Sequence, residues 1–139
     1  MQEGELIRNF IVGSTQRNKN GFEYAFVIID NNKIVGRIGI YKIDQQNKIG
    51  QIDYWIAESI QGRGIIAKSC KGLIDNSFTQ LQLKRIEIKC GADNTMSQKI
   101  PERSGFKYKA TIRQGKWVKN RFIDLKLYSL LKEEWILYL

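Results

Sequence analysis

The sequence contains no histidine, and this absence removes several kinds of chemistry at once. Ser-His-Asp and Cys-His catalysis both need an imidazole. A zinc site is also disfavoured, because the only cysteines, Cys70 and Cys90, form no paired ligand motif. We therefore expect no metal centre, and acid–base chemistry falls to carboxylates, Lys, Tyr, Ser acting through water, or the substrate's own groups.

Proline occurs once, and no apolar run approaches the roughly 20 residues of a membrane span. The first 20 residues lack the apolar stretch and the small-residue cleavage site of a signal peptide. A chain of 139 residues has the length of one domain and can bury about two-thirds of its unfolded surface. We therefore expect one cytoplasmic domain over residues 1–139, with no membrane contact.

Acidic residues are the scarcer charged class, since 14 Asp and Glu against 23 Lys and Arg give a formal net charge of +9. An anionic partner such as nucleic acid or a phosphorylated cofactor is one explanation of this excess, and solubility is another. The basic residues are dispersed and form no dense tract. Charge alone therefore leaves both explanations open.

Hydrophobic patterning predicts a mixed α/β domain with the element order β-β-β-α-β-α-β-β. The predicted strands are 21–30, 34–43, 50–57, 85–91, 106–118 and 122–131. Apolar residues at three- and four-residue spacing predict a long helix over 64–81. Asn94 is placed to cap a short helix over 95–104, and apolar positions near the start indicate a further helix within 1–16.

The segment Gln61-Gly62-Arg63-Gly64 lies between a predicted strand and the start of the long helix. Glycines there allow a tight turn with outward-pointing amide N–H groups, which together with the helix dipole form a cradle for a pyrophosphate. Arg63 would add a charge-assisted contact. The spacing fits neither the Rossmann fingerprint nor the P-loop, so a structural turn is an equally good explanation of the glycines alone.

The surrounding motifs resemble those of the GNAT N-acetyltransferase superfamily. They are the strand-loop-helix 52–67, then Asn94-x-x-Ser97, then 101–106 (PERSGF). Three of the motifs resemble those of the RimJ/RimL-type branch, which acetylates the N-termini of ribosomal proteins: Tyr54-Trp55-Ile56, Asn94-x-x-Ser97 and Ser104-Gly105-Phe106. The resemblance extends from about residue 23 to 135, which is most of the chain.

This resemblance implies an α/β (α+β) fold, with a mixed, mostly antiparallel sheet that is splayed at its centre and flanked by helices. It implies acetyl-coenzyme A as cofactor, its pantetheine arm lying between strands 51–57 and 85–91. An amine would attack the thioester directly, and a main-chain amide near Ile56 would serve as oxyanion hole. The implied cofactor-binding residues are Trp55, Ile56, Gln61, Gly62, Arg63, Gly64, Ile65, Ile66, Ala67, Asn94, Ser97 and Arg103.

The candidate catalytic residues are Ser97, which the resemblance implies, and Asp53, which lies where the ribosomal branch more often has glycine. Many members of the superfamily use a tyrosine as general acid where this chain has Pro101, whereas the ribosomal branch uses a serine at the position of Ser97. The alternative for Ser97 is a first-turn contact with the cap residue Asn94. The ribosomal branch usually carries an acidic residue at Lys116, so Asp53 or Asp124 would have to replace it as base, unless each is only a solvated or salt-bridged carboxylate.

The acceptor follows in part from amine chemistry. An α-amino group has a pKa of about 7.7–8.0, so roughly a tenth to a fifth of it is neutral at pH 7, against fewer than about one in a thousand for a lysine amine. A weak base therefore favours a protein or peptide N-terminus, and the resemblance implies a ribosomal protein as partner, without direct nucleic-acid binding. A catalytically impaired acetyl-coenzyme A-binding domain and an acetyltransferase for a small-molecule amine remain the alternatives.

The start of the chain is short for the resemblance, because family members usually open with a further strand and helix ahead of this region. Strand 21–30 is therefore expected to be an exposed sheet edge, which invites pairing with another chain. A truncated chain, a shortened gene product or a homodimer that covers this edge would each account for it.

Overall fold

The structure is a computed structural model that describes residues 10–18, 21–62 and 64–137. Its elements, in chain order, are β1 (Phe10–Asn18), β2 (Gly21–Asp30), β3 (Lys33–Asp44), β4 (Ile49–Ile56), the 3-10 turn η1 (Glu58–Ile60), α2 (Ile65–Thr79), β5 (Arg85–Gly91), α3 (Thr95–Arg103), β6 (Lys107–Val118), β7 (Arg121–Leu131) and α4 (Lys132–Ile136). No helix in these ranges is long and apolar enough to cross a membrane.

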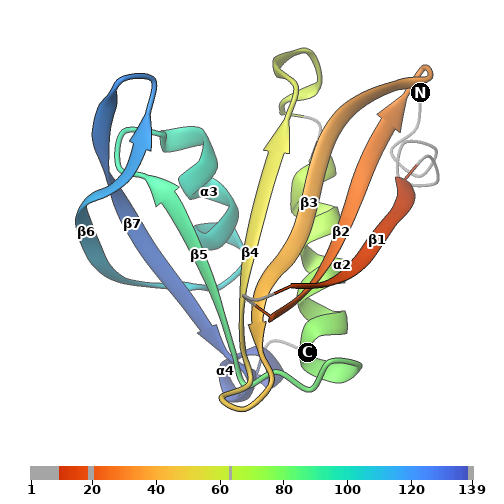
Figure 1. The fold of residues 1–139 in the computed structure, drawn as a ribbon, viewed down its shortest axis with the longest axis vertical. Coiled ribbons are helices and arrows are strands. Elements are labelled where there is room, and N and C mark those ends of the chain that lie inside the picture. The colour runs from red at the N-terminus through yellow and green to blue at the C-terminus, as the bar shows by residue number, and fades with distance from the viewer. Residues whose placement is uncertain (1–9, 19–20, 63, 138–139) are drawn as a thin grey trace.

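The seven strands form one sheet in the order β1-β2-β3-β4-β5-β7-β6. All neighbours are antiparallel except β4 and β5, which pair in parallel only where 49–51 lies beside 85–87. Beyond this short ladder the two strands diverge, so the sheet opens as a V between them (Figure 1). The prediction of a mixed, mostly antiparallel sheet splayed at its centre is therefore confirmed.

Helices α2 and α3 lie against the same face of the sheet and contact each other (Figure 1). The alternation of β5 explains this packing, because Ile86, Ile88 and Cys90 all point to that face and are buried. The apolar side of α2 meets Ile38 and Ile40 of β3 in the same core. One continuous core therefore joins the two arms of the V on the side of the helices.

The prediction of a helix within 1–16 is wrong for residues 10–16, because they belong to β1. Residues 1–9 lie outside the described part of the chain. The apolar spacing there is compatible with either conformation, and pairing with β2, from Phe10 opposite Ile28 to Asn18 opposite Gly21, satisfies the backbone as a strand. The expectation that strand 21–30 is a sheet edge is wrong for the same reason. Of the described strands, β1 and β6 lie at the two edges of the sheet.

The remaining predicted elements are confirmed with small shifts at their ends. The long helix begins at Ile65 and ends at Thr79, and the short helix 95–103 follows Asn94 as its N-cap. The last two strands form a hairpin whose turn residues, Lys119 and Asn120, have φ values of 48° and 68°. Positive φ at both central positions is typical of the tight turns whose twist matches that of paired strands. Together with β5, this hairpin forms one arm of the V (Figure 1).

Candidate active site

The parting of β4 from β5 leaves backbone groups of β4 facing the opening. The N–H of Ala57 donates to Val35 O on β3 at 2.7 Å. Because N–H groups alternate in direction along a strand, the N–H of Ile56 points away from β3 and toward the opening. The pairing of β4 with β5 ends at Gln51, so Ile56 has no strand partner on that side among the described residues. The predicted oxyanion position is therefore available to a ligand.

The glycine loop after β4 forms a left-handed turn. Gly62 has φ 84° and Gly64, the N-cap of α2, has φ 74°, values that favour glycine. No side chain caps the first turn of α2, and a Cβ added to Gly62 would meet no atom within 4 Å. The described part of the loop thus presents open backbone at a helix N-terminus, a geometry suited to phosphate groups.

The other predicted cofactor-binding residues of the loop and of the first turn of α2 differ in how exposed their side chains are. The side chains of Ile65 and Ile66 are buried, at 3% and 5% exposure, and pack in the small core with Ile28. They therefore leave the loop unobstructed and contribute only main-chain groups toward a ligand. Ala67 is half-buried, and Gln61 is exposed, with its Nε2 3.5 Å from Ile56 O. Arg63 lies outside the described residues.

Asn94 and Ser97 form the first-turn helix contact that was the alternative expectation for Ser97. The Ser97 N–H donates to Asn94 Oδ1 at 3.0 Å, which makes Asn94 the side-chain cap of α3. Both residues also line the opening between the arms of the sheet. Arg103, at the far end of α3, is exposed and does not line this cavity.

A buried polar cluster, not predicted from the sequence, joins β4 to the start of α3. The Tyr54 hydroxyl donates to Ser97 O at 2.6 Å and lies 3.7 Å from Cys90 Sγ. Burial raises the pKa of the Tyr54 hydroxyl, with the neighbouring Cys90 as a further cause, and burial also raises the pKa of the Cys90 thiol. Both groups therefore stay protonated at neutral pH and serve as donors. In the sequence, the signal for this cluster was the alternation along 85–91, which predicts that Cys90 shares one strand face with Ile86 and Ile88.

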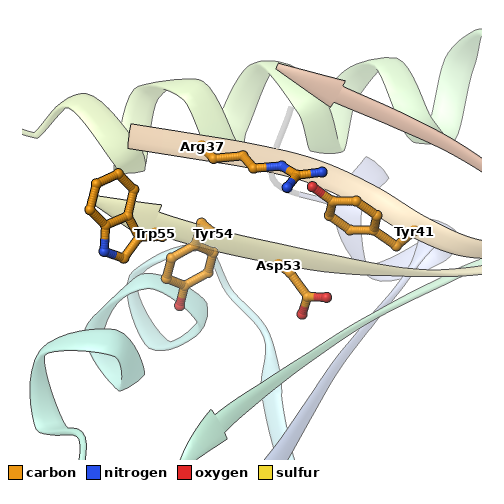
Figure 2. Close-up of a pocket in the computed structure, with 5 residues that line it drawn as sticks. All are labelled: Arg37, Tyr41, Asp53, Tyr54 and Trp55. Carbon is orange, nitrogen blue, oxygen red and sulfur yellow. The ribbon is translucent and has the colours of Figure 1, made fainter. Parts of the chain in front are cut away.

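Asp53 lies on the opposite face of β4 from Tyr54. Figure 2 shows the hollow that Asp53 shares with Arg37, Tyr41, Tyr54 and Trp55, which has a volume of about 270 Å³. The Asp53 carboxylate accepts from Gln51 Nε2 at 3.1 and 3.3 Å, and Trp55 is 56% exposed. The hollow therefore combines an accessible carboxylate with aromatic walls.

The Tyr41 ring reaches this hollow because β3 has a glycine two residues before it. A Cβ on Gly39 would come within 2.7 Å of the Tyr41 ring and 2.8 Å of Tyr24 O. The Arg37 guanidinium lies 5.6 Å from the centre of the same ring. Burial raises the pKa of Tyr41, so its hydroxyl stays neutral beside Arg37.

A larger cavity of about 960 Å³ lies in the V itself. It brings together Asp53, Tyr54, Asn94, Ser97 and Lys116, although they come from β4, α3 and β6. Its walls therefore combine the predicted catalytic pair with the first turn of α3. The described residues of the glycine loop lie outside it. Two regions thus emerge, a loop suited to phosphates and a cavity suited to the reacting groups.

Asp124 does not join this cavity. Its Oδ1 accepts from the Gln114 N–H at 2.8 Å, at an irregularity in the pairing of β6 with β7. The carboxylate therefore has a structural partner in the hairpin. Of the two candidate replacements for a base, the geometry favours Asp53.

Comparison with known proteins assigns this arrangement to a family. The model of the acetyltransferase (GNAT) domain matches residues 2–107. The putative ribosomal N-acetyltransferase YdaF of Bacillus subtilis is 38% identical over 116 residues, which cover 84% of this chain and 62% of the relative. The ribosomal-protein-serine acetyltransferase of Escherichia coli is 30% identical over 129 residues, which cover 93% of this chain and 72% of the relative.

Among solved structures, RimL, a ribosomal L7/L12 alpha-N-protein acetyltransferase in complex with coenzyme A, matches with a TM-score of 0.73 at 27% identity. The match covers 78% of this chain and 62% of RimL. The chain thus spans about three-fifths of the length of both YdaF and RimL. Domain match, relatives and architecture agree, and the chain belongs to the GNAT acetyltransferase family.

Proposed function

We propose that the chain, acting as one domain over residues 1–139, is an acetyl-coenzyme A-dependent N-acetyltransferase whose acceptor is the α-amine of a protein or peptide N-terminus. The observation that carries the proposal is the parting of β4 from β5, which turns the Ile56 N–H toward the opening. A main-chain donor fixed in this way can stabilise negative charge on a carbonyl oxygen during acyl transfer.

The residues present fit the cofactor. Acetyl-coenzyme A supplies the acetyl group as a thioester. The amides of 62–66 would bind its pyrophosphate, and the free edge of β4 at Trp55 and Ile56 would bind the pantetheine arm together with Asn94. Ile65 and Ile66 would contribute only main-chain groups, since their side chains are buried. Gln61, Arg63, Ala67 and Arg103 complete the proposed set.

Asp53 and Ser97 are the proposed catalytic residues. Asp53 would accept a proton from the acceptor ammonium, directly or through water, which leaves a neutral amine for attack. The Ser97 hydroxyl would donate a proton to the departing thiolate. Asn94 and Tyr54 would position Ser97, because they bind its N–H and its carbonyl respectively.

An N-terminal amine is the acceptor that this site can deprotonate most easily, since its pKa of about 7.7–8.0 leaves part of it neutral at pH 7. Both curated relatives carry ribosomal acetyltransferase names, which supports a ribosomal protein N-terminus and a cytoplasmic location. A catalytically impaired coenzyme-binding domain is the alternative favoured by Lys116, which replaces an acidic residue with a cation inside the cavity.

Calorimetric titration of the chain with acetyl-coenzyme A, followed by thiol release with serine- and alanine-initiated peptides, tests the proposal. We expect one-to-one binding at micromolar affinity, about −8 kcal/mol, and thiol release that depends on a free peptide N-terminus. The matched control is the same peptide with a blocked N-terminus. Binding without release would support the impaired domain, and absence of binding by the folded chain would overturn the proposal.

A further inference from the structure

Cationic side chains outnumber carboxylates in the lining of the cavity in the V. Five cationic side chains face it, namely Lys42, Lys89, Lys116, Lys119 and Arg121. Among the described residues, two carboxylates line it, those of Asp53 and Asp93. Within the part of the chain that the structure describes, none of the five cations forms a salt bridge. The cavity therefore carries an excess of positive charge that its own walls do not neutralise.

Strand register places three of these cations on one face. Lys89 lies opposite Leu127, and its neighbour Cys90 points to the side of α3. Across β6 and β7, Lys116 lies opposite Ile123, and Val118 lies opposite Arg121. Since side chains of directly opposed residues share a face and alternate along the strand, Lys89, Lys116 and Arg121 all face away from α2 and α3.

Asp53 shares that face. Its neighbours Ile52 and Tyr54 belong to the side that packs on the helices, so Asp53 points the other way. The accessible carboxylate and the cations of the β6–β7 hairpin thus stand on the same side of the V, on opposite arms. A ligand that reaches both must bring a cation to one arm and anions to the other.

The phosphates of the coenzyme do not account for these cations. The phosphate-binding geometry lies at the N-terminus of α2, which packs on the opposite face, and none of the described loop residues lines the cavity. A polyamine acceptor does not fit either, because its several cations would meet the unneutralised lysines. The remaining candidate is an acceptor with one cation and neighbouring anions.

We infer that the cavity selects acceptor N-termini followed by acidic residues, with Asp53 receiving the α-ammonium group and Lys116, Lys119 and Arg121 receiving the carboxylates of the next residues. This inference rests on the proposed function and names its acceptor class. The five cations raise the local concentration of acidic peptides and penalise basic ones. The matching surface on the partner is an unblocked N-terminus in an acidic segment.

The test uses three peptides that begin with the same serine and continue with Glu and Asp, with Gln and Asn, or with Lys and Arg. We expect kcat/KM to fall in that order, by about tenfold from the acidic to the neutral peptide, equal to about 1.4 kcal/mol. Raising the salt concentration should reduce the difference, since the pairs are solvent-accessible. Anisotropy of the same labelled peptides with coenzyme A present measures the preference without turnover.

The variant Lys116→Gln/Lys119→Asn removes two of the cations, and asparagine suits the positive φ of position 119. It should lose most of the preference for the acidic peptide. The control Lys33→Gln/Lys84→Gln removes the same charge from exposed positions outside the cavity and should keep it.

Two results distinguish the inference from the proposed function. Equal rates and equal affinities for the three peptides would overturn the inference while leaving the enzyme activity intact. Selective binding of the acidic peptide without acetylation would support the inference and contradict the proposed function. A preference that the control variant loses as readily as the cavity variant would assign the effect to net charge and overturn the inference.

Discussion

Tyr54 links β4 to the first turn of α3. Its hydroxyl donates to the Ser97 carbonyl across 43 residues of sequence, and its ring packs against the main core. Because the ring sits on the helix face of β4, the contact holds the start of α3 against the arm that carries Ile56. This hydroxyl, together with the Cys90 thiol that also donates to Ser97 O, therefore helps to set the distance between the proposed general acid and the proposed oxyanion donor.

Replacing Tyr54 by Phe should lower the free energy of unfolding by about 1 kcal/mol, because a part-buried hydrogen bond is lost. Urea titration followed by fluorescence measures this change. Tyr108→Phe is the matched control, since its hydroxyl meets Thr111 Oγ1 at an exposed site and its loss should have a smaller effect. Equal losses in the two variants would mean that the Tyr54 contact contributes nothing beyond an exposed one.

Cys70 gives a pH-dependent prediction. The side chain is fully buried in the core, and burial raises the pKa of its thiol to about 12, whereas the unfolded thiol ionises near 8.5. The folded state therefore keeps a proton that the unfolded state loses, so this contribution is complete below about pH 8.5 and declines as the pH rises toward 12. By pH 9.5 Cys70 should account for a loss of about 1.4 kcal/mol relative to pH 7.

The measurement compares urea titrations of the wild-type chain and of Cys70→Ala at pH 7 and pH 9.5. The variant should be less stable at pH 7, because a cavity is created, but its stability should fall less on raising the pH. Cys90 remains in both proteins, so its own raised pKa cancels in the comparison. Parallel losses in the two proteins would show that the Cys70 thiol is not the titrating group.

At the scale of elements, the N-cap of α3, Asn94, can both cap the helix and bind a ligand. Asn94 accepts from the Ser97 N–H and so fixes the first turn, and the same residue lines the cavity and is proposed to bind the pantetheine arm. The cap uses only the side-chain oxygen. The amide NH₂ is the group that a coenzyme carbonyl would use, and so the two roles can be separated by substitution.

Asn94→Asp should keep the cap, because a carboxylate accepts from the same N–H and suits a helix N-terminus. It loses the NH₂ donor, so the affinity for acetyl-coenzyme A should fall roughly two- to tenfold. Asn94→Ala should lose the same affinity and also about 1 kcal/mol of stability. Calorimetry and urea titration measure the two effects. Unchanged affinity in Asn94→Asp would limit Asn94 to the cap.

The elements that the sequence predicts well are those whose pattern is local. The apolar stripe of α2, the Asn94 cap and the alternation of β5 each depend on residues within one segment, and all three are confirmed. Strand β1 is different, because its apolar positions suit a helix as well and only pairing with β2 decides between them. The Tyr54–Ser97 contact depends on how two distant segments meet, which no local pattern contains.

At the scale of the molecule, the sheet consists of two arms joined at one end. Among the described residues, the parallel ladder of 49–51 with 85–87 is the only strand pairing between them. The resemblance, rather than the composition, predicted that the sheet is splayed at its centre. The core nevertheless crosses the junction, since Ile52 of one arm and Ile88 of the other belong to the same buried cluster. We therefore expect both arms to unfold together.

A ligand that bridges the two arms should stabilise the whole molecule. At a concentration one hundred times its dissociation constant, acetyl-coenzyme A should add about 2.7 kcal/mol to the free energy of unfolding. For a domain of this size that corresponds to an increase in the melting temperature of about 10 °C. Differential scanning calorimetry should show one transition that moves as a whole, because the bound pantetheine arm would contact both strands of the opening.

ATP at the same concentration is the control, because it carries phosphates but no pantetheine arm. The chain has a formal net charge of +9, so any polyanion can raise its stability without a specific site. An equal shift with ATP would attribute the stabilisation to charge and contradict the bridging site. A shift confined to coenzyme A and its acetyl form, and retained at raised salt, would support a specific site between β4 and β5, where the Ile56 N–H has no strand partner among the described residues.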